Sequence, residues 1–144
     1  MQTQFYWTQH FPAKGKIELV QTYRPVVGGS YITADNDGAG SIKLYCGSTD
    51  LLEKIKQSKS KYPAKQGTDA VLMERTIQYI LKTGNNWNGP IASFQLSVVA
   101  DSPDDLVLTC MPGLKRVAPT RYELVRTSYR PDSDLDLLIL QPNR

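Results

Sequence analysis

Hydrophobic and polar residues alternate along many stretches of the chain, which is the period-2 pattern of half-buried β-strands. Ala70–Lys82 is also long enough for a helix, but its β-branched and aromatic residues favour a strand. Turn signals recur about every ten residues, a spacing typical of an antiparallel β-sandwich. The predicted strands are Gln4–Gln9, Lys16–Tyr23, Ile42–Cys46, Ala70–Lys82, Ile91–Val99, Leu106–Cys110, Arg121–Thr127 and Asp134–Leu140.

One stretch has helical rather than alternating periodicity. Asp50–Gln57 follows a Gly-Ser-Thr segment that can cap a helix, and Leu51, Leu52 and Ile55 form one apolar stripe. The predicted fold is therefore mainly β, an antiparallel sandwich that is immunoglobulin-like in general architecture, with one short α-helix. The 144 residues suit a single domain, 1–144. No apolar stretch approaches the roughly 20 residues of a membrane-spanning helix.

The two cysteines, Cys46 and Cys110, each follow the alternation of the aliphatic residues before them. Period-2 alternation predicts that both thiols point toward a core. Two interpretations remain open at this point. The residues are buried free thiols that act as small hydrophobes, or they form one disulfide, which favours an oxidising compartment.

The densest turn signal is T-G-N-N-W-N-G-P, between two apolar runs, with Trp87 at its centre. A Trp in an Asn/Gly-rich turn is costly to expose, so it either plugs one end of the sandwich or anchors a binding partner. Trp87 and the flanking Asn85, Asn86 and Asn88 are the candidate binding surface.

Other polar residues are better explained by exposure to solvent than by a catalytic or metal-binding role. His10, the only histidine, precedes a turn and is expected at the surface. The loop from Asp35 to Gly40 breaks the EF-hand pattern, because Ala39 falls at a ligand position and Cys46 falls where the bidentate Glu belongs.

The net charge of +3 is too small to indicate nucleic-acid binding by itself, and the lysines at 54–65 have acidic neighbours, as on a solvated face. Asp134 and Asp136 alternate with leucines and are expected on the solvent face of the last strand, while an irregular calcium site with Asp132 is the alternative. We predict no catalytic residue, cofactor or metal site, and no nucleic-acid partner.

Several motifs, spread in order over almost the whole chain, resemble a family of exported bacterial proteins, domain of unknown function 4424. They are W-T-Q-H-F-P, Y-R-P-V-V-G-G-S, Y-C-G-S-T-D, Y-I-L-K-T-G-N-N-W-N-G-P-I-A-S-F-Q-L, D-D-L-V-L-T-C, V-A-P-T-R-Y-E-L and Y-R-P-D-S-D-L-D-L-L-I-L. The resemblance implies a periplasmic or secreted location. It also implies a longer precursor with a signal peptide, of which this chain is the C-terminal half, and a Cys46–Cys110 disulfide. It implies no catalytic residues.

Three hypotheses of function follow. The favoured one is a non-enzymatic envelope module that binds an unknown protein or has a structural role, through a sheet edge or the Trp87 turn. The second is an envelope hydrolase that is completed by a missing N-terminal half and depends on His10. The third is a glycan-binding module. An open sheet edge would also allow homodimerisation by strand pairing.

Overall fold

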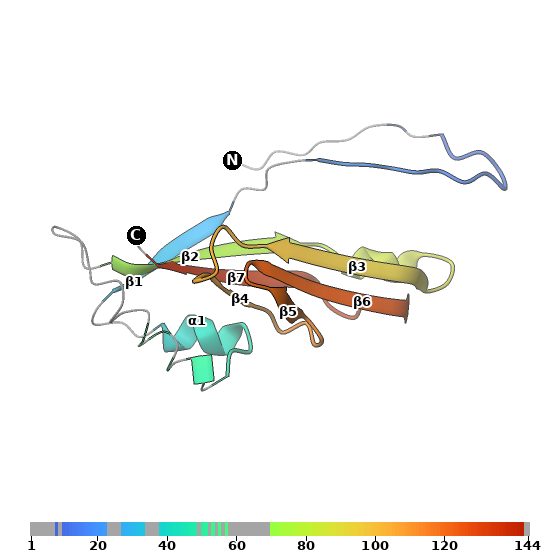
Figure 1. Cartoon of the computed structure of the whole chain (residues 1–144). Helices are drawn as coiled ribbons and strands as arrows, with labels where there is room; N and C mark the ends of the chain where they lie inside the picture. Colours follow the sequence, from blue (N-terminus) through green and yellow to red (C-terminus); the bar gives the residue numbers. More distant parts are fainter. Residues whose placement is uncertain are drawn as a thin grey trace.

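The computed structural model describes residues 8, 10–22, 27–33, 38–48, 50–51, 53, 55, 57 and 70–142. In this part of the chain, seven strands form two sheets, with orders β1-β2-β7-β4 and β3-β6-β5 (Figure 1). All the pairings are antiparallel, so the predicted mainly β, antiparallel fold is confirmed. The strands are β1 (Gly28–Thr33), β2 (Ala70–Tyr79), β3 (Ile91–Val99), β4 (Leu106–Leu108), β5 (Lys115–Ala118), β6 (Arg121–Tyr129) and β7 (Leu135–Pro142).

Strand β7 lies between β2 and β4 and is buried on both faces. Leu135 and Leu137 belong to the core that includes residues of both sheets, so the two sheets pack face to face there. Leu138 and Leu140, which point to the other face, belong to a second core under the helices. This double burial explains the uninterrupted apolar run Leu137–Leu140 within β7.

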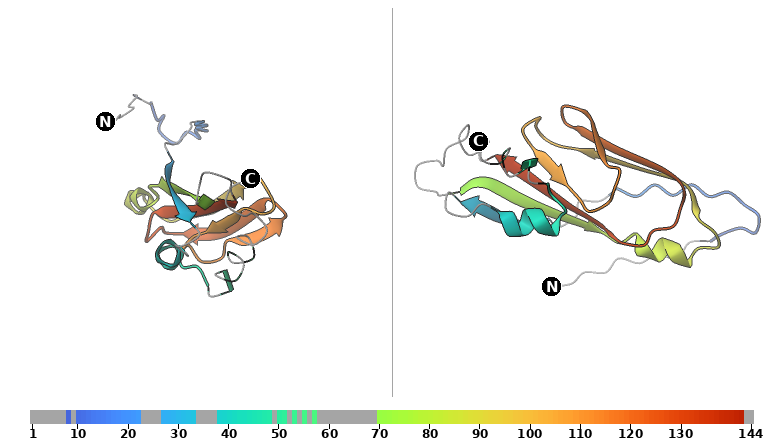
Figure 2. Two further views of the ribbon diagram at one scale, coloured as in Figure 1. Left: turned by 90° about the vertical axis from the view of Figure 1, so that its left-hand side faces the viewer. Right: turned by 90° about the horizontal axis from the view of Figure 1, so that it is seen from below.

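Helical residues cover the second face of the four-stranded sheet. Helix α1 (Ala39–Leu44) lies there (Figures 1 and 2), and residues 50, 51, 53, 55 and 57 are also helical. The predicted apolar stripe is buried at its described positions, because Leu51 is 7% exposed and Ile55 is 1% exposed. The predicted helix over 50–57 is therefore confirmed where the structure describes it.

The predicted strand at Ile42–Cys46 is wrong, because these residues lie in α1 and the turn that follows it. Gly38 precedes the helix at φ 69°, a conformation that glycine adopts at little cost. Side chains two residues apart on a helix point about 200° apart, so only one of an alternating pair is buried. Accordingly Ile42 is 3% exposed and Leu44 is 73% exposed.

The other strand predictions fare better. The strand at Ile91–Val99 has the predicted bounds, and β2 ends three residues earlier than predicted, at Tyr79. Strands β4, β6 and β7 fall within two residues of their predicted ends. Strands β1 and β5 have no counterpart among the predictions.

The predicted hairpin near the N-terminus is wrong where the structure describes it. Residues 16–22 are in no strand, and the segment 10–22 runs outside the two sheets (Figure 1). Its turn is present, because Gly15 N donates a hydrogen bond to Pro12 O at 3.1 Å. Most of the predicted partner strand, Gln4–Gln9, lies outside the described residues. A two-stranded hairpin that joins no larger sheet is at best marginally stable in water.

Candidate functional sites: the Trp87 turn and a pocket beside the disulfide

The segment between β2 and β3 is a short 3-10 helix, η1 (Lys82–Asn86), followed by Trp87. It lies at the right-hand end of β3 in Figure 1. Gly84 N donates to Leu81 O at 2.8 Å, and Trp87 N donates to Gly84 O at 3.3 Å. Gly89 has a φ of 111°, a backbone conformation that residues other than glycine rarely adopt. Its N–H donates a hydrogen bond to Trp87 O at 2.9 Å. The backbone around Trp87 is therefore defined by local hydrogen bonds.

This turn is also tied to the loop between β6 and β7. The Asp134 carboxylate oxygen Oδ1 accepts hydrogen bonds from Leu81 N and Lys82 N, both at 2.9 Å. The Asn85 side-chain amide donates to Pro131 O. Asp134 therefore caps the start of η1, in addition to the exposed position that the alternation predicted for it.

The Trp87 indole is 65% exposed although its backbone is held in place. The interpretation of Trp87 as a plug for the end of the sandwich is therefore wrong. Asn85, Asn86 and Asn88 are exposed as well. Asn85 is occupied in holding the turn, which leaves Trp87, Asn86 and Asn88 as the surface available to a partner.

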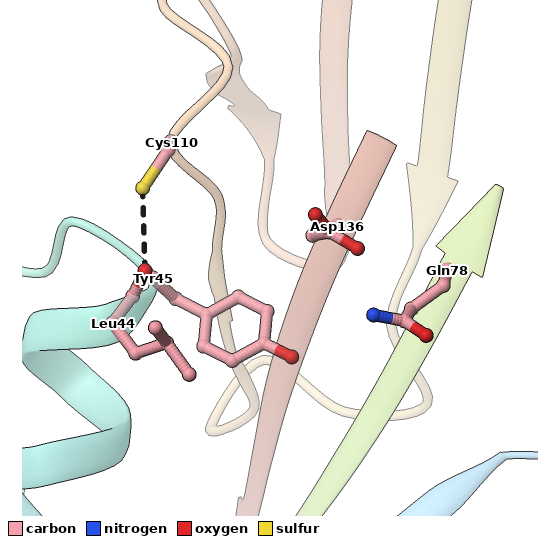
Figure 3. Close-up of a pocket in the computed structure, with 5 residues that line it drawn as sticks. All are labelled: Leu44, Tyr45, Gln78, Cys110 and Asp136. Atoms are coloured by element: carbon pink, nitrogen blue, oxygen red, sulfur yellow. Dashed lines mark hydrogen bonds between the residues drawn. The ribbon is translucent and has the colours of Figure 1, made fainter. Parts of the chain in front are cut away.

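A pocket of about 220 Å³ opens between α1 and the four-stranded sheet. Figure 3 shows its five lining residues, with the Tyr45 ring lying across β7 toward β2. Gln78 and Asp136 are directly paired across β2 and β7, which brings an amide and a carboxylate to the same face. The lining residues are Leu44, Tyr45, Gln78, Cys110 and Asp136.

The surroundings of the Tyr45 phenol disfavour its ionisation. Burial raises the pKa of Tyr45 above its ordinary value, and the negative charges of Asp136 and Glu74 raise it further. Glu74 is 7% exposed, and its Oε2 accepts a hydrogen bond from the Ser30 hydroxyl. The pocket thus offers a phenol, an amide and a carboxylate, which can form hydrogen bonds with a small polar group.

The disulfide forms one wall of this region, since Cys46 and Cys110 are bonded with a Cα–Cα distance of 4.9 Å. The family resemblance implied this pair, whereas the interpretation as two free buried thiols is wrong. The prediction that both thiols point toward a core is also wrong, because both cysteines are exposed. Cys46 has a φ of 57° and Cys110 comes two residues after β4 ends, so neither continues a strand. The Cys110 sulfur lies 3.4 Å from Leu44 O (dashed in Figure 3), a polar contact rather than a donated proton, because a disulfide sulfur carries none.

The remaining candidates do not gather into a site. His10 is exposed in the N-terminal segment, and Asp136 is half-buried in the pocket rather than beside Asp132 on a solvent face. Within the ranges that the structure describes, no three His, Cys, Asp or Glu side chains are grouped as metal ligands would be. The acidic loop at 34–37 and the lysines at 54, 56, 59, 61 and 65 lie outside those ranges.

A search for membrane-spanning helices finds none that is long and apolar enough among the described residues. Comparison with curated proteins and with solved structures finds no match to the chain. One family model does match, over residues 1–138, which is nearly the whole chain. The chain therefore belongs to the family described as domain of unknown function (DUF4424).

Proposed function

We propose that this chain is a non-enzymatic, periplasmic or secreted module that binds a protein partner through Trp87, Asn86 and Asn88. The observation that carries this proposal is the 65% exposure of Trp87 on a turn that is fixed by hydrogen bonds to Asp134 and Pro131. Trp is enriched among the residues that contribute most to binding at interfaces. Because the turn is already ordered, a partner covers the indole at little further cost in conformational entropy.

The disulfide supports the proposed compartment. Disulfides persist mainly in oxidising environments such as the periplasm and the extracellular space. The bond between Cys46 and Cys110 is exposed, so its persistence depends on the redox state of the surroundings more than on burial. Fractionation of cells that produce the natural protein, with alkylation of free thiols during lysis, tests this location.

The test of binding compares Trp87→Ala with Phe11→Ala. Both aromatic side chains are 65% exposed, but Phe11 belongs to the N-terminal segment and is not part of the turn. The chain is immobilised and exposed to envelope proteins of its own source organism, with chemical cross-linking. We expect a partner that wild type and Phe11→Ala retain and Trp87→Ala loses, at unchanged melting temperature. A partner that Trp87→Ala retains equally well would refute the proposed surface.

The exposed amides of Asn86 and Asn88 beside the indole favour glycan binding as a second candidate function. Amides hydrogen-bond sugar hydroxyls while an indole covers the apolar face of a sugar ring. Titration of glycan fragments into a Trp7→Phe variant, in which Trp87 is the only fluorophore of its kind, tests this function. A saturable shift that Asn88→Ala weakens would support it, and no response across a broad panel would refute it.

A further inference from the structure

Strand β3 has an unusually open outer edge. It pairs with β6 on one side, and no strand of the described residues pairs with its other side. Its register with β6 is regular from Ser93 opposite Thr127 to Val99 opposite Arg121, with no bulge. Nine residues long, it presents a straight row of backbone groups that an added strand could use.

The other sheet edges carry features that discourage pairing. Strand β5 has four residues, begins with Lys115 and Arg116, and shifts register before Ala118. Strand β4 has only three residues, and β1 begins with two glycines and shifts register between Ile32 and Thr33. Short strands, charged residues and irregularities are the usual protection of an exposed edge. The sequence of β3, I-A-S-F-Q-L-S-V-V, has no charge, no Pro and no Gly.

We propose that β3 pairs antiparallel with β3 of a second copy of this chain. The two-fold axis passes midway between Gln95 of one copy and Gln95 of the other. The side chains of opposed residues must point to the same face, so their positions sum to an even number. With Gln95 opposite Gln95 of the second copy, all nine residues of the strand are paired. This pairing joins two three-stranded sheets into one continuous sheet.

The strand is complementary to itself in this register. On the inner face, Phe94 lies opposite Leu96 of the second copy, and both side chains pack against the core between the sheets. On the outer face, the exposed Ser93 lies opposite Ser97 of the second copy. No charged residue opposes another at any position, and apolar cross-strand pairs stabilise such a ladder. This self-complementarity favours a second copy over a strand of another protein.

Each dimer would carry two Trp87 turns. Trp87 precedes β3 by a few residues, so antiparallel pairing places the two turns at opposite ends of the shared ladder, which is about 30 Å long. The dimer does not depend on the proposed function of Trp87, because the turn lies outside the paired residues.

The first test compares Gln95→Lys with Val125→Lys in the full chain. Gln95 and Val125 are cross-strand neighbours on the exposed outer face, but Val125 belongs to the interior strand β6. Sedimentation equilibrium is measured up to about 1 mM, the weak end of measurable association. We expect wild type and Val125→Lys to dimerise. Gln95→Lys places two lysines opposite each other at the axis, so we expect its dissociation constant to rise about two- to fivefold.

The second test fixes the register. Gln95→Cys adds one thiol to a chain whose two cysteines are bonded to each other, and opposed Cβ atoms at about 5 Å allow a disulfide after small adjustment. We expect mild oxidation to give a covalent dimer of Gln95→Cys and none of Val125→Cys. The proposal would be overturned if the wild type stays monomeric at about 1 mM, or if Gln95→Lys dimerises as tightly as the wild type. It would also be overturned if an added protein protects the β3 amides from hydrogen exchange while a higher concentration of this chain alone does not.

Discussion

Replacing Asp134 with alanine should loosen the Trp87 turn without unfolding the domain. Its Oδ1 accepts two backbone hydrogen bonds of 2.9 Å, from Leu81 and Lys82, as an N-cap side chain does for a helix. Loss of a helix cap costs about 1 kcal/mol, and a hydrogen bond to a charged acceptor contributes about 1.5–3 kcal/mol. Asp134 is exposed, so water replaces part of what is lost. We expect a loss of about 1–2 kcal/mol in unfolding free energy.

Urea unfolding and thermal melting measure that loss, and about 2–4 °C per kcal/mol is expected for a chain of this size. In a Trp7→Phe background, the fluorescence anisotropy of Trp87 should fall, because the indole gains motion. Asp134→Asn keeps one carbonyl oxygen as acceptor and should lose about half as much, since neutral hydrogen bonds are roughly half as strong. Asp132→Ala is the control, because this exposed carboxylate lies in the same loop and, among the residues that the structure describes, accepts a hydrogen bond from the Ser133 hydroxyl alone, at 3.2 Å. Equal stability and anisotropy in Asp134→Ala and Asp132→Ala would refute the anchoring role.

Three further predictions concern the stability of the fold. The disulfide closes a loop of 64 positions, so the double variant Cys46→Ser, Cys110→Ser should lower the unfolding free energy by about 4 kcal/mol. Intact-mass measurement of the wild type should show alkylated cysteines only after reduction. Leu138 is 0% exposed, so Leu138→Ala should lower the free energy of urea unfolding by about 2–5 kcal/mol. Val125 is 63% exposed, so Val125→Ala should change that free energy by no more than about 0.5 kcal/mol. Equal losses in the two variants would contradict the described core. Because the folded state raises the Tyr45 pKa, it holds that proton more tightly than the unfolded chain, so unfolding free energy should fall as pH rises above about 10. Tyr45→Phe should reduce that fall in an alkaline unfolding series, and an unchanged slope would contradict the raised pKa.

Long alternating stretches with bulky residues could be predicted from the sequence, because their period matches strands that bury one face. Strand β3 has the predicted bounds for this reason. Strands β1 and β5 could not be predicted in the same way. All four residues of β5 are exposed and β1 opens with two glycines, so neither has an apolar face to alternate. Both lie at sheet edges and depend on the neighbouring strand for their hydrogen bonds.

Predictions made from only a few residues were wrong where a helix and a strand give the same pattern of apolar and polar residues. The five residues Ile42–Cys46 alternate, yet the stretch becomes helical because Ile42 reaches a core formed with β1, β2 and β7. The placement of the disulfide failed for a related reason. Cys46 and Cys110 were expected to point inward because they extend strand patterns, but both lie just beyond the regular element before them. A contact set by distant parts of the chain leaves no local periodicity.

The candidate site was only half predictable for the same reason. The turn chemistry around Trp87 is local, and the sequence indicated the turn and its aromatic centre. The exposure of Trp87 depends on Asp134 and Pro131, which are more than 40 residues away along the chain. Nothing near Trp87 in the sequence distinguishes a plug from an exposed anchor. The pocket residues Tyr45 and Asp136 were likewise brought together by tertiary packing alone.

The exposed indole and the uncharged β3 edge are two features that the stability of the monomer does not require. Trp87 gains little from the fold, since most of its surface remains in water, and an unprotected nine-residue edge invites aggregation. The other sheet edges that the structure describes are protected, so the open edge of β3 is an exception within this fold. Covering by a partner resolves each cost separately. Gln95→Lys should therefore weaken the dimer while leaving binding by Trp87 intact, and Trp87→Ala should do the reverse. A single variant that removed both activities would mean that the two surfaces are parts of one interface.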